Sequence, residues 1–483
     1  MDDSAKQFRA WDVMEGRREI YCPEETLLQH DLVFFLLDLI PQLDLSAFHK
    51  FYSTDGRGQP PFNVQMMVTL LVYSYAVGVF SSRKIMLACE RNLAFLAIVG
   101  NDRPNFRTIS DFRKDHKPAM KPLFLEVLRV AGELQMVKLG NLSTDGTKIH
   151  ANASRHKAMS YGYMEKELTR LQTEIDQLLE NADRTDAEQD AVHGSRRGDE
   201  LPAELQRRED RIAKIQEAKA RLEAEAKVRT DAKQQERDAA QAQREAEGRK
   251  RRGKLPAPID PTPEDKAQTS FTDPEAKVMK QSNKGYDYSY NSQATVDSAH
   301  QIIVAAEVTN AANDKQQAVP QAKATLENLA AAGIALPRDE QGQPQPIPHT
   351  ADTGYYSEAN VTEAAAMGFD PYYATGRQKH HPAPEVLVGE PSEAAGSSSA
   401  SQSFASKSQS PKEAMAAKLR TETGRKLYAA RKQIVEPVFG QIKSVRGFRQ
   451  YLVRGLEPVS AEWQLICLTH NVLKIWRHQM RVR

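Results

Sequence analysis

Cysteine is scarce in this 483-residue chain, which has only Cys22, Cys89 and Cys467. The three lie far apart and none belongs to a Cys-x-x-Cys pair, so the sequence excludes a disulfide framework and a cysteine-based zinc site and fits a reducing cytoplasm. The sequence also lacks a Gly-rich phosphate loop and a Ser-His-Asp spacing. These absences direct the search for chemistry towards carboxylates and basic residues.

Long apolar runs are also lacking. The longest uncharged run, residues 64–82, barely reaches the length of a membrane span and is interrupted by polar residues, so it predicts a buried helix. The first twelve residues are acidic and polar, unlike a secretory signal or a transit peptide. We therefore expect no membrane partner.

Excess charge of one sign is missing as well, because the net charge is only +2. Any affinity for nucleic acid must then come from local clustering. Residues 425–454 are such a cluster, with eight Lys or Arg and one acid, Glu436. An acid alone among cations either neutralises them or holds something that they cannot, such as a metal ion.

A proline decides which side chains of this basic stretch share one side of a helix. On a continuous helix, Tyr428, Lys432, Glu436 and Lys443 lie on one side, beside an apolar stripe. Pro437 must either kink that helix or start a new one with Glu436 as its cap, so the position of Lys443 relative to Glu436 stays open.

Residues 1–135 are predicted to form an all-α domain, because apolar residues recur at helical spacing between breaks. Its segment 104–114, PNFRTISDFRK, places Arg107, Arg113 and Lys114 around Phe112. Two short helices with exposed basic residues predict a helix-turn-helix that contacts DNA, although an ordinary helical bundle would look the same.

Residues 136–160 change to β-prone segments around Asp145. An isolated Asp-Gly pair is most often a turn, but the flanking residues here favour a strand. Residues 161–270 are then highly charged, with apolar residues in a heptad frame on both sides of a polar connection, which predicts an antiparallel helical hairpin. The charged surface of this hairpin is either a solvated face or a dimer contact.

The rest of the chain alternates strands and helices. Residues 271–381 predict two strands over 284–310, a helix over 314–331, a strand that ends at Asp352 and a strand over 369–377. Residues 382–418 are rich in Ser, Ala and Pro and predict a flexible linker. Residues 419–483 predict the closing helices. The whole describes a mixed α/β core with an inserted helical hairpin.

Three carboxylates stand out in this arrangement, Asp145 and Asp352 at strands and Glu436 on a late helix. Hard oxygen ligands from separate elements suit a pair of Mg²⁺ ions, which can activate an attacking oxygen and stabilise a leaving oxygen at phosphorus. Asp297 and Asp273 are rival acids, in a hairpin turn and a loop. His150 and His349, each near an acid, suggest either a metal site or ordinary polar neighbours of a strand.

At these residues the chain resembles bacterial insertion-sequence transposases of the DDE type, which have a ribonuclease H-like catalytic core. The resemblance rests on the DFRK region, STDGTKIHANAS (143–154), TDPEAKVM (272–279), ADTGYYS (351–357) and YAARKQIVEPVFGQIK (428–443). It implies Asp145, Asp352 and Glu436 as catalytic residues and ligands of two Mg²⁺ ions, with Mn²⁺ as a substitute.

The last of these segments resembles the family signature of Tyr, a basic residue, Glu and Lys. It implies DNA contacts by Tyr428, Arg431 or Lys432, and Lys443. The usual spacing from the Tyr selects Arg431, whereas the spacing to the Glu selects Lys432.

The resemblance implies an enzyme that binds the terminal inverted repeats of its element, cleaves DNA with metal-activated water and joins the freed 3′ end to target DNA. It also implies a homodimer on double-stranded DNA in the bacterial cytoplasm, at the nucleoid. Two alternatives remain: a catalytically inactive, transposase-derived DNA-binding protein, and a coiled-coil scaffold built on residues 161–227.

Overall fold

The computed structural model describes residues 22–52, 61–100, 102–193, 202–246, 248, 257–281, 283–376 and 410–482. The chain divides into two compact units. One comprises residues 1–116 with 476–483, and the other comprises residues 117–475.

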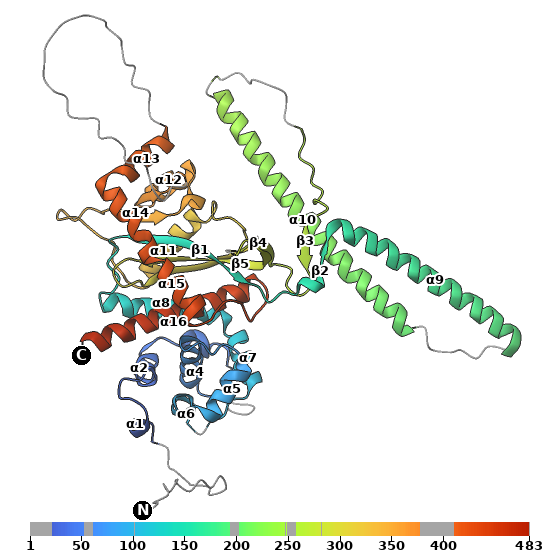
Figure 1. Cartoon of the computed structure of the whole chain (residues 1–483), viewed down its shortest axis with the longest axis horizontal. Helices are drawn as coiled ribbons and strands as arrows, with labels where there is room; N and C mark the ends of the chain where they lie inside the picture. The colour runs from blue at the N-terminus through green and yellow to red at the C-terminus, as the bar shows by residue number, and fades with distance from the viewer. Residues whose placement is uncertain are drawn as a thin grey trace, which may run out of the picture. The chain divides into compact units, whose positions relative to one another are not determined.

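The smaller unit is helical (Figure 1). Asparagine side chains start three of its helices, because Asn63, Asn92 and Asn105 each accept a hydrogen bond from a backbone N–H of the first turn. Its helices are α1 (Pro23–Thr26), α2 (Leu32–Leu39), α3 (Ser46–His49), α4 (Val64–Ala76), α5 (Ser82–Arg91), α6 (Leu93–Val99) and α7 (Phe106–Asp115). The uncharged run forms α4, a buried helix as predicted. None of the helices in the described part of the chain is long and apolar enough to cross a membrane.

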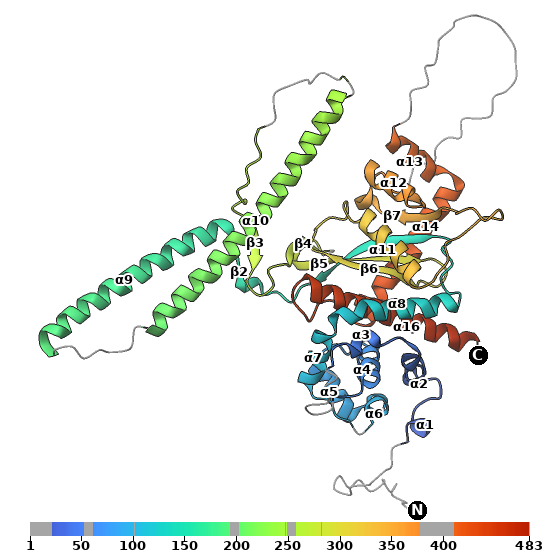
Figure 2. The same cartoon turned by 180° about the vertical axis from the view of Figure 1, so that it is seen from behind.

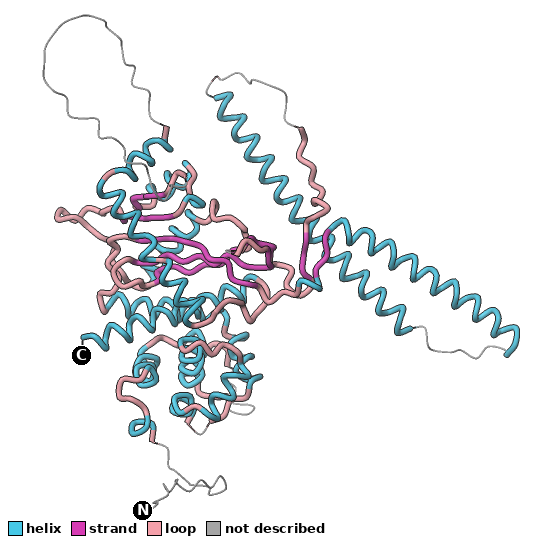
Figure 3. Tube along the Cα trace, viewed as in Figure 1, coloured by secondary structure: helices cyan, strands magenta, loops and turns pink. Residues whose placement is uncertain are grey.

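The larger unit is built on a mixed sheet of six strands, so the mixed α/β prediction is confirmed (Figures 1 and 3). Strand β1 (Leu142–His150) lies at its centre, antiparallel to β5 (Tyr286–Asp297) and parallel to β7 (Ile347–Ala351). Outside β7 lies the parallel strand β8 (Phe369–Tyr373). Outside β5 lie β4 (Lys277–Lys280) and β6 (Ile303–Thr309), both antiparallel to it.

Helices from distant parts of the chain cover this sheet. They are α8 (Met120–Glu133), α11 (Ala318–Ala331), α12 (Glu358–Ala366), α13 (Pro411–Arg420), α14 (Glu422–Ile434), α15 (Glu436–Gly440) and α16 (Leu456–Val482). Two buried side chains fix α16 against the sheet. Trp463 donates from Nε1 to the carbonyl of Gln293 at 2.9 Å, and the Asn471 amide bonds both the N–H and the carbonyl of Ile303.

The inserted segment forms the predicted hairpin, α9 (Tyr161–His193) and α10 (Pro202–Ala246), with the small ladder β2 (Ala158–Ser160) and β3 (Gln268–Ser270) at its base (Figures 1 and 2). The heptad residues pack between the two helices as predicted. The buried members of the core are Tyr161, Met164, Leu171, Ile215, Ala218 and Leu222.

Two expected boundaries differ from the structure. Helix α8 belongs to the unit that contains the sheet, because it packs on α11, so the division falls after residue 116 and not at residue 135. The linker expected over 382–418 ends earlier. Residues 382–409 lie outside the described part of the chain, but α13 begins at Pro411, where Ser410 and Glu413 form a reciprocal capping box.

Candidate active site

The register of two parallel strands brings two predicted acids together. Leu142, Ser143 and Thr144 of β1 face His349, Thr350 and Ala351 of β7. The next position in the same register pairs Asp145 with Asp352, where β7 ends. Neighbouring strands are about 4.8 Å apart, so the two aspartates arise side by side at the carboxyl end of β7.

Asp145 is a largely buried carboxylate with one cationic partner. Nη1 of Arg431 lies 3.0 Å from Oδ2 of Asp145, and the backbone N–H of Gly146 donates to Oδ1 at 2.8 Å. Burial raises the pKa of Asp145 to about 6, and the charge of Asp352 adds to that rise, although Arg431 opposes it. The site therefore holds more negative charge than Arg431 neutralises.

A third acid of this site, Asp314, was not singled out from the sequence. It lies in the connection between β6 and α11, and its Oδ1 accepts hydrogen bonds from Asn291 Nδ2 at 2.7 Å and Gln293 Nε2 at 2.8 Å. Its charge also contributes to the raised pKa of Asp145. Nζ of Lys148 lies 3.8 Å from Asp314 Oδ1, close enough to offset part of this charge. The available signal was the order strand, Asp, helix, which Asp314 shares with Asp352.

Glycine at position 146 allows Asp314 and its two amide partners to lie close to β1. A Cβ there would lie 2.4 Å from Gln293 Nε2 and 2.8 Å from Oδ1 of both Asn291 and Asp314. Side chains alternate along a strand, so Gly146 belongs to the face opposite Asp145. The missing side chain thus lets Asp314 and its partners pack against β1 directly behind the position of Asp145.

The helix that contains the basic cluster changes direction at the proline. Helix α14 ends at Ile434, α15 starts at Glu436, and a π-helical turn follows over Gln441–Val445. Of the two alternatives that Pro437 left open, the structure shows a new helix, which begins at Glu436 with Val435 as its N-cap.

Of the two adjacent basic residues of α14, only Arg431 faces the site. Arg431 is buried and contacts Asp145, with its guanidinium carbon 5.8 Å from the centre of the Tyr428 ring, whereas Lys432 is exposed. From the π turn, Lys443 donates to Thr147 Oγ1 at 3.0 Å and to the carbonyl of Lys148 at 3.1 Å. Burial lowers the pKa of Lys443.

The carboxylates match the oxygen ligands of a divalent cation, but they do not form a closed site. The like charges around half-buried Asp145 create a charge imbalance that a divalent cation would offset. Glu436 is exposed at the first turn of α15. Within the described residues, no three His, Cys, Asp or Glu side chains are grouped closely enough to hold a metal ion. The structure thus brings Asp145 and Asp352 together without Glu436.

The rival acids have structural partners. Asp273 is buried and accepts hydrogen bonds from Tyr290 Oη and the Gly455 N–H, and Asp297 accepts from the backbone N–H groups of Leu139 and Ala299. These carboxylates therefore connect segments within the larger unit, away from the contacts of Asp145.

The two histidines also have local partners. His349 is fully buried, with Nε2 2.7 Å from Thr144 Oγ1 and Nδ1 2.9 Å from Tyr373 Oη. Its burial lowers its pKa to about 4. Nδ1 of His150 lies 3.2 Å from Asp287 Oδ2. These contacts favour the second alternative for the two histidines, that of ordinary polar neighbours of a strand.

In the helical unit, the three predicted DNA contacts differ in exposure. Arg107 and Lys114 are exposed on α7. Arg113 instead donates from Nη1 to Tyr75 Oη at 2.7 Å and to the carbonyl of Phe80 at 3.4 Å. Arg113 thus contributes to the packing of the helices, and Arg107 and Lys114 are the two that reach solvent.

Two protein families match the chain. The family described as Transposase domain (DUF772) matches residues 23–115, and the family described as Transposase DDE domain matches residues 394–476. No curated protein and no solved structure matches the chain significantly. The first match spans α1 to α7, and the second contains Arg431, Glu436 and Lys443. The chain thus contains two regions that match transposase families, one of them a transposase DDE domain.

Proposed function

We propose that this protein cleaves DNA at the terminal inverted repeats of its own element and transfers the freed ends to target DNA, with a ribonuclease H-like core. The observation that carries the proposal is the parallel register of β1 and β7, which pairs the position of Asp145 with that of Asp352. The mixed sheet with β1 at its centre is the arrangement expected of such a core.

In this proposal the acids and cations have separate roles. Asp145, Asp352 and Glu436 are the metal ligands, and Mg²⁺ bound there would lower the barrier for attack at phosphorus and for departure of the leaving oxygen. Arg431 holds the carboxylate of Asp145 in place, and Lys148 does the same for Asp314. Lys443 connects the π turn to β1, which keeps the helix that contains Glu436 against the sheet.

The cleavage step is hydrolysis of a phosphodiester. A water oxygen forms a bond to phosphorus while the bond from phosphorus to the 3′ oxygen breaks, which leaves a 3′ hydroxyl and a 5′ phosphate. In the joining step the 3′ hydroxyl takes the place of water. Its oxygen forms a bond to a phosphorus of the target while the bond from that phosphorus to the target 3′ oxygen breaks, which releases a 3′ hydroxyl on the target strand. The two steps use the same acids, so loss of one acid should abolish both.

The DNA contacts follow from exposed cations. Lys432 on α14 and Arg107 and Lys114 on α7 reach solvent, where they can neutralise backbone phosphates without reading sequence. Two element ends must be held for transfer, and we propose a homodimer on double-stranded DNA for that purpose.

A second candidate function is DNA binding without cleavage. The observation that favours it is the exposed position of Glu436, since no group of three potential ligands forms among the described side chains. If the protein is an enzyme, Glu436 must move to the metal site when DNA binds. If it only binds DNA, Glu436 needs no such movement.

Cleavage of a labelled duplex that contains the element end distinguishes the two functions. The wild type is compared in Mg²⁺, Mn²⁺ and EDTA with Glu436→Gln and with Glu422→Gln, which removes an exposed acid from the preceding helix α14. The enzyme predicts metal-dependent 3′-hydroxyl nicks that Glu436→Gln abolishes and Glu422→Gln retains. Binding with no nick in any metal, by any of the three proteins, would replace the proposal with the DNA-binding function.

A further inference from the structure

A cavity of about 460 Å³ lies at the base of the helical hairpin. One wall is the first part of α10, and the opposite wall is the segment before and within β2. Half-buried Met159 and Phe271 and buried Ile215 contribute apolar surface to it and also pack in the hairpin core. The cavity is therefore supported by the packed core of the hairpin.

The cavity is strongly basic. Arg207, Arg211 and Lys214 line it from α10, and His156 and Lys157 line it from the other wall, whereas Asp210 is its one acid. Positions 207, 211 and 214 follow the i, i+4, i+7 spacing of one helix face. The paired helix differs, because α9 has nine Asp or Glu and three Lys or Arg. The basic face at the cavity therefore belongs to α10, and the helix paired with it is acidic.

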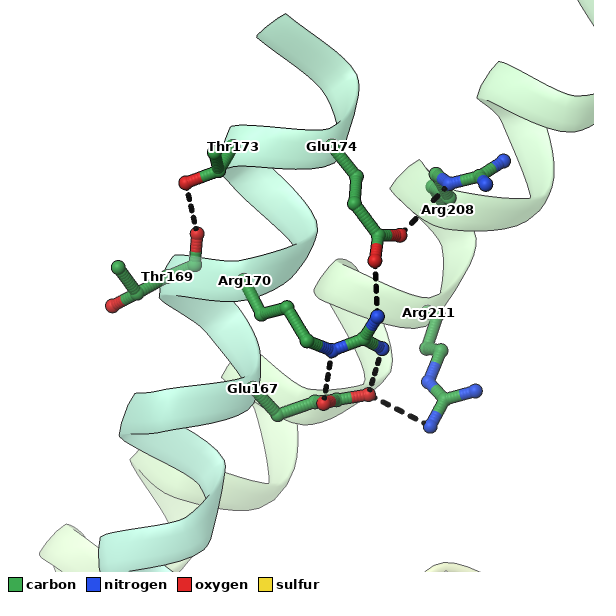
Figure 4. Close-up of polar contacts among 7 residues, drawn as sticks. All are labelled: Glu167, Thr169, Arg170, Thr173, Glu174, Arg208 and Arg211. Atoms are coloured by element: carbon green, nitrogen blue, oxygen red, sulfur yellow. Dashed lines mark hydrogen bonds and ion pairs between the residues drawn. The ribbon is translucent and has the colours of Figure 1, made fainter. Parts of the chain in front are cut away.

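Part of this charge is used to hold the hairpin together (Figure 4). Arg211 Nη2 lies 2.9 Å from Oε1 of Glu167, which is almost fully buried, and Arg208 lies 3.2 Å from Glu174 on α9. Arg207 and Lys214 are exposed, and neither is ion-paired with another described residue. These two cations are available to a ligand, while their neighbours fix the helix that presents them.

We propose that this cavity binds the phosphate backbone of DNA, so that the hairpin is a DNA-positioning arm of the transposase. This inference rests on the proposed function. Seven residues of helix span about 10 Å, and one DNA strand has a phosphate roughly every 3.4 Å along its axis. The basic face of α10 therefore matches about three consecutive phosphates, which is more than a single free anion needs.

The test measures DNA affinity of the full-length protein in EDTA, so that no cleavage takes place. The double variant Arg207→Gln with Lys214→Gln is compared with Arg229→Gln with Lys233→Gln, which removes the same charge from exposed positions further along α10. Each lost phosphate contact changes the slope of log affinity against log salt by about 0.9. We expect the slope of the cavity variant to fall by about 2 and its affinity at 0.15 M salt to fall roughly 30-fold. The control variant should match the wild type.

Two outcomes would overturn the inference: an unchanged slope in a cavity variant whose thermal melting matches that of the wild type, or an equal loss in the control variant. Titration with pyrophosphate separates the sources of phosphate. Binding of pyrophosphate that depends on Arg207 and Lys214, with unchanged DNA affinity, would assign the cavity to a free phosphate compound instead. A wild type that binds DNA but does not nick it in Mg²⁺ would contradict the proposed function and leave the cavity result standing.

Discussion

Nη1 of Arg431 lies 3.0 Å from Oδ2 of Asp145, although the two residues are 286 positions apart in the chain. This contact ties the first strand of the sheet to the late basic helix. It also leaves the site negative, because Asp352 and Asp314 act on Asp145 as well.

Replacement of Asp145 by Asn should stabilise the metal-free protein at neutral pH. Burial raises the pKa of Asp145 from 3.8 to about 6, so the folded state binds this proton more tightly than the unfolded state does. Its stability therefore falls as pH rises from about 4 to 6 and stays lower above that range. The shift is worth about 3 kcal/mol at neutral pH, since one pKa unit is about 1.4 kcal/mol. Asn mimics the neutral carboxyl and should keep that stability.

Calorimetry at pH 4 and pH 7.5 checks this prediction, with the exposed residue Glu363→Gln as a control for the loss of a charge. The wild type and Asp145→Asn should have the same melting temperature at pH 4, and Asp145→Asn should have the higher melting temperature at pH 7.5. Mg²⁺ should raise the melting temperature of the wild type and leave that of Asp145→Asn unchanged. A wild type that is the more stable protein at pH 7.5 without metal would refute the argument.

Arg431 and Lys432 should have separable effects on cleavage and on DNA binding. Arg431→Gln removes the cation beside Asp145 and should raise the pKa of Asp145 further, so the pH at which cleavage is half-maximal should move upward. Lys432→Gln removes an exposed charge and should lower the salt slope of DNA affinity by about 1. Cleavage by Lys432→Gln at saturating DNA should equal that of the wild type. If Lys432→Gln instead changed the pH dependence of cleavage and Arg431→Gln changed only the salt slope, Lys432 would be the basic signature residue. The spacing to Glu436, and not the contact with Asp145, would then identify it.

Gly146→Ala should disturb the site from behind β1. The added methyl would lie 2.4 Å from Gln293 Nε2 and 2.8 Å from Asp314 Oδ1, so these side chains must move. Overpacking of this kind costs about 1–3 kcal/mol of stability. We expect a drop of at least tenfold in cleavage, if the displaced Asp314 supports the site as proposed. Gly140→Ala, at a position with nothing within 4 Å of the added carbon, is the matched control and should change neither quantity.

Local signals predicted much of the fold. The β-prone residues around Asp145 form β1, and the heptads of residues 161–227 form the packed hairpin, because both patterns are properties of neighbouring residues. The pairing of Asp145 with Asp352 required knowledge of which strands are adjacent, and the resemblance supplied it. Asp314 remained hidden because its role depends on Asn291 and Gln293, which approach it only in the folded sheet. The choice between Arg431 and Lys432 likewise depended on which side of α14 faces the sheet, and the spacing of the signature residues did not fix that orientation.

His349 should make the larger unit sensitive to acid. Burial lowers its pKa to about 4, so the ring is neutral in the folded protein and takes up a proton on unfolding at any pH between about 4 and 6.5. The unfolded state binds more protons in this window, and the stability that His349 contributes falls as pH decreases through it, by about 3 kcal/mol in total.

His349→Gln keeps a polar side chain near Thr144 and Tyr373 but cannot be protonated. The variant should be less stable at pH 7.5 through imperfect packing, and its stability should fall less than that of the wild type between pH 6.5 and 4. Asp145 acts with the opposite sign in this range, so the comparison is made in the Asp145→Asn background, where only the histidine effect remains. Parallel pH profiles for the two proteins in that background would show that folding leaves the pKa of His349 unchanged, and would refute the argument.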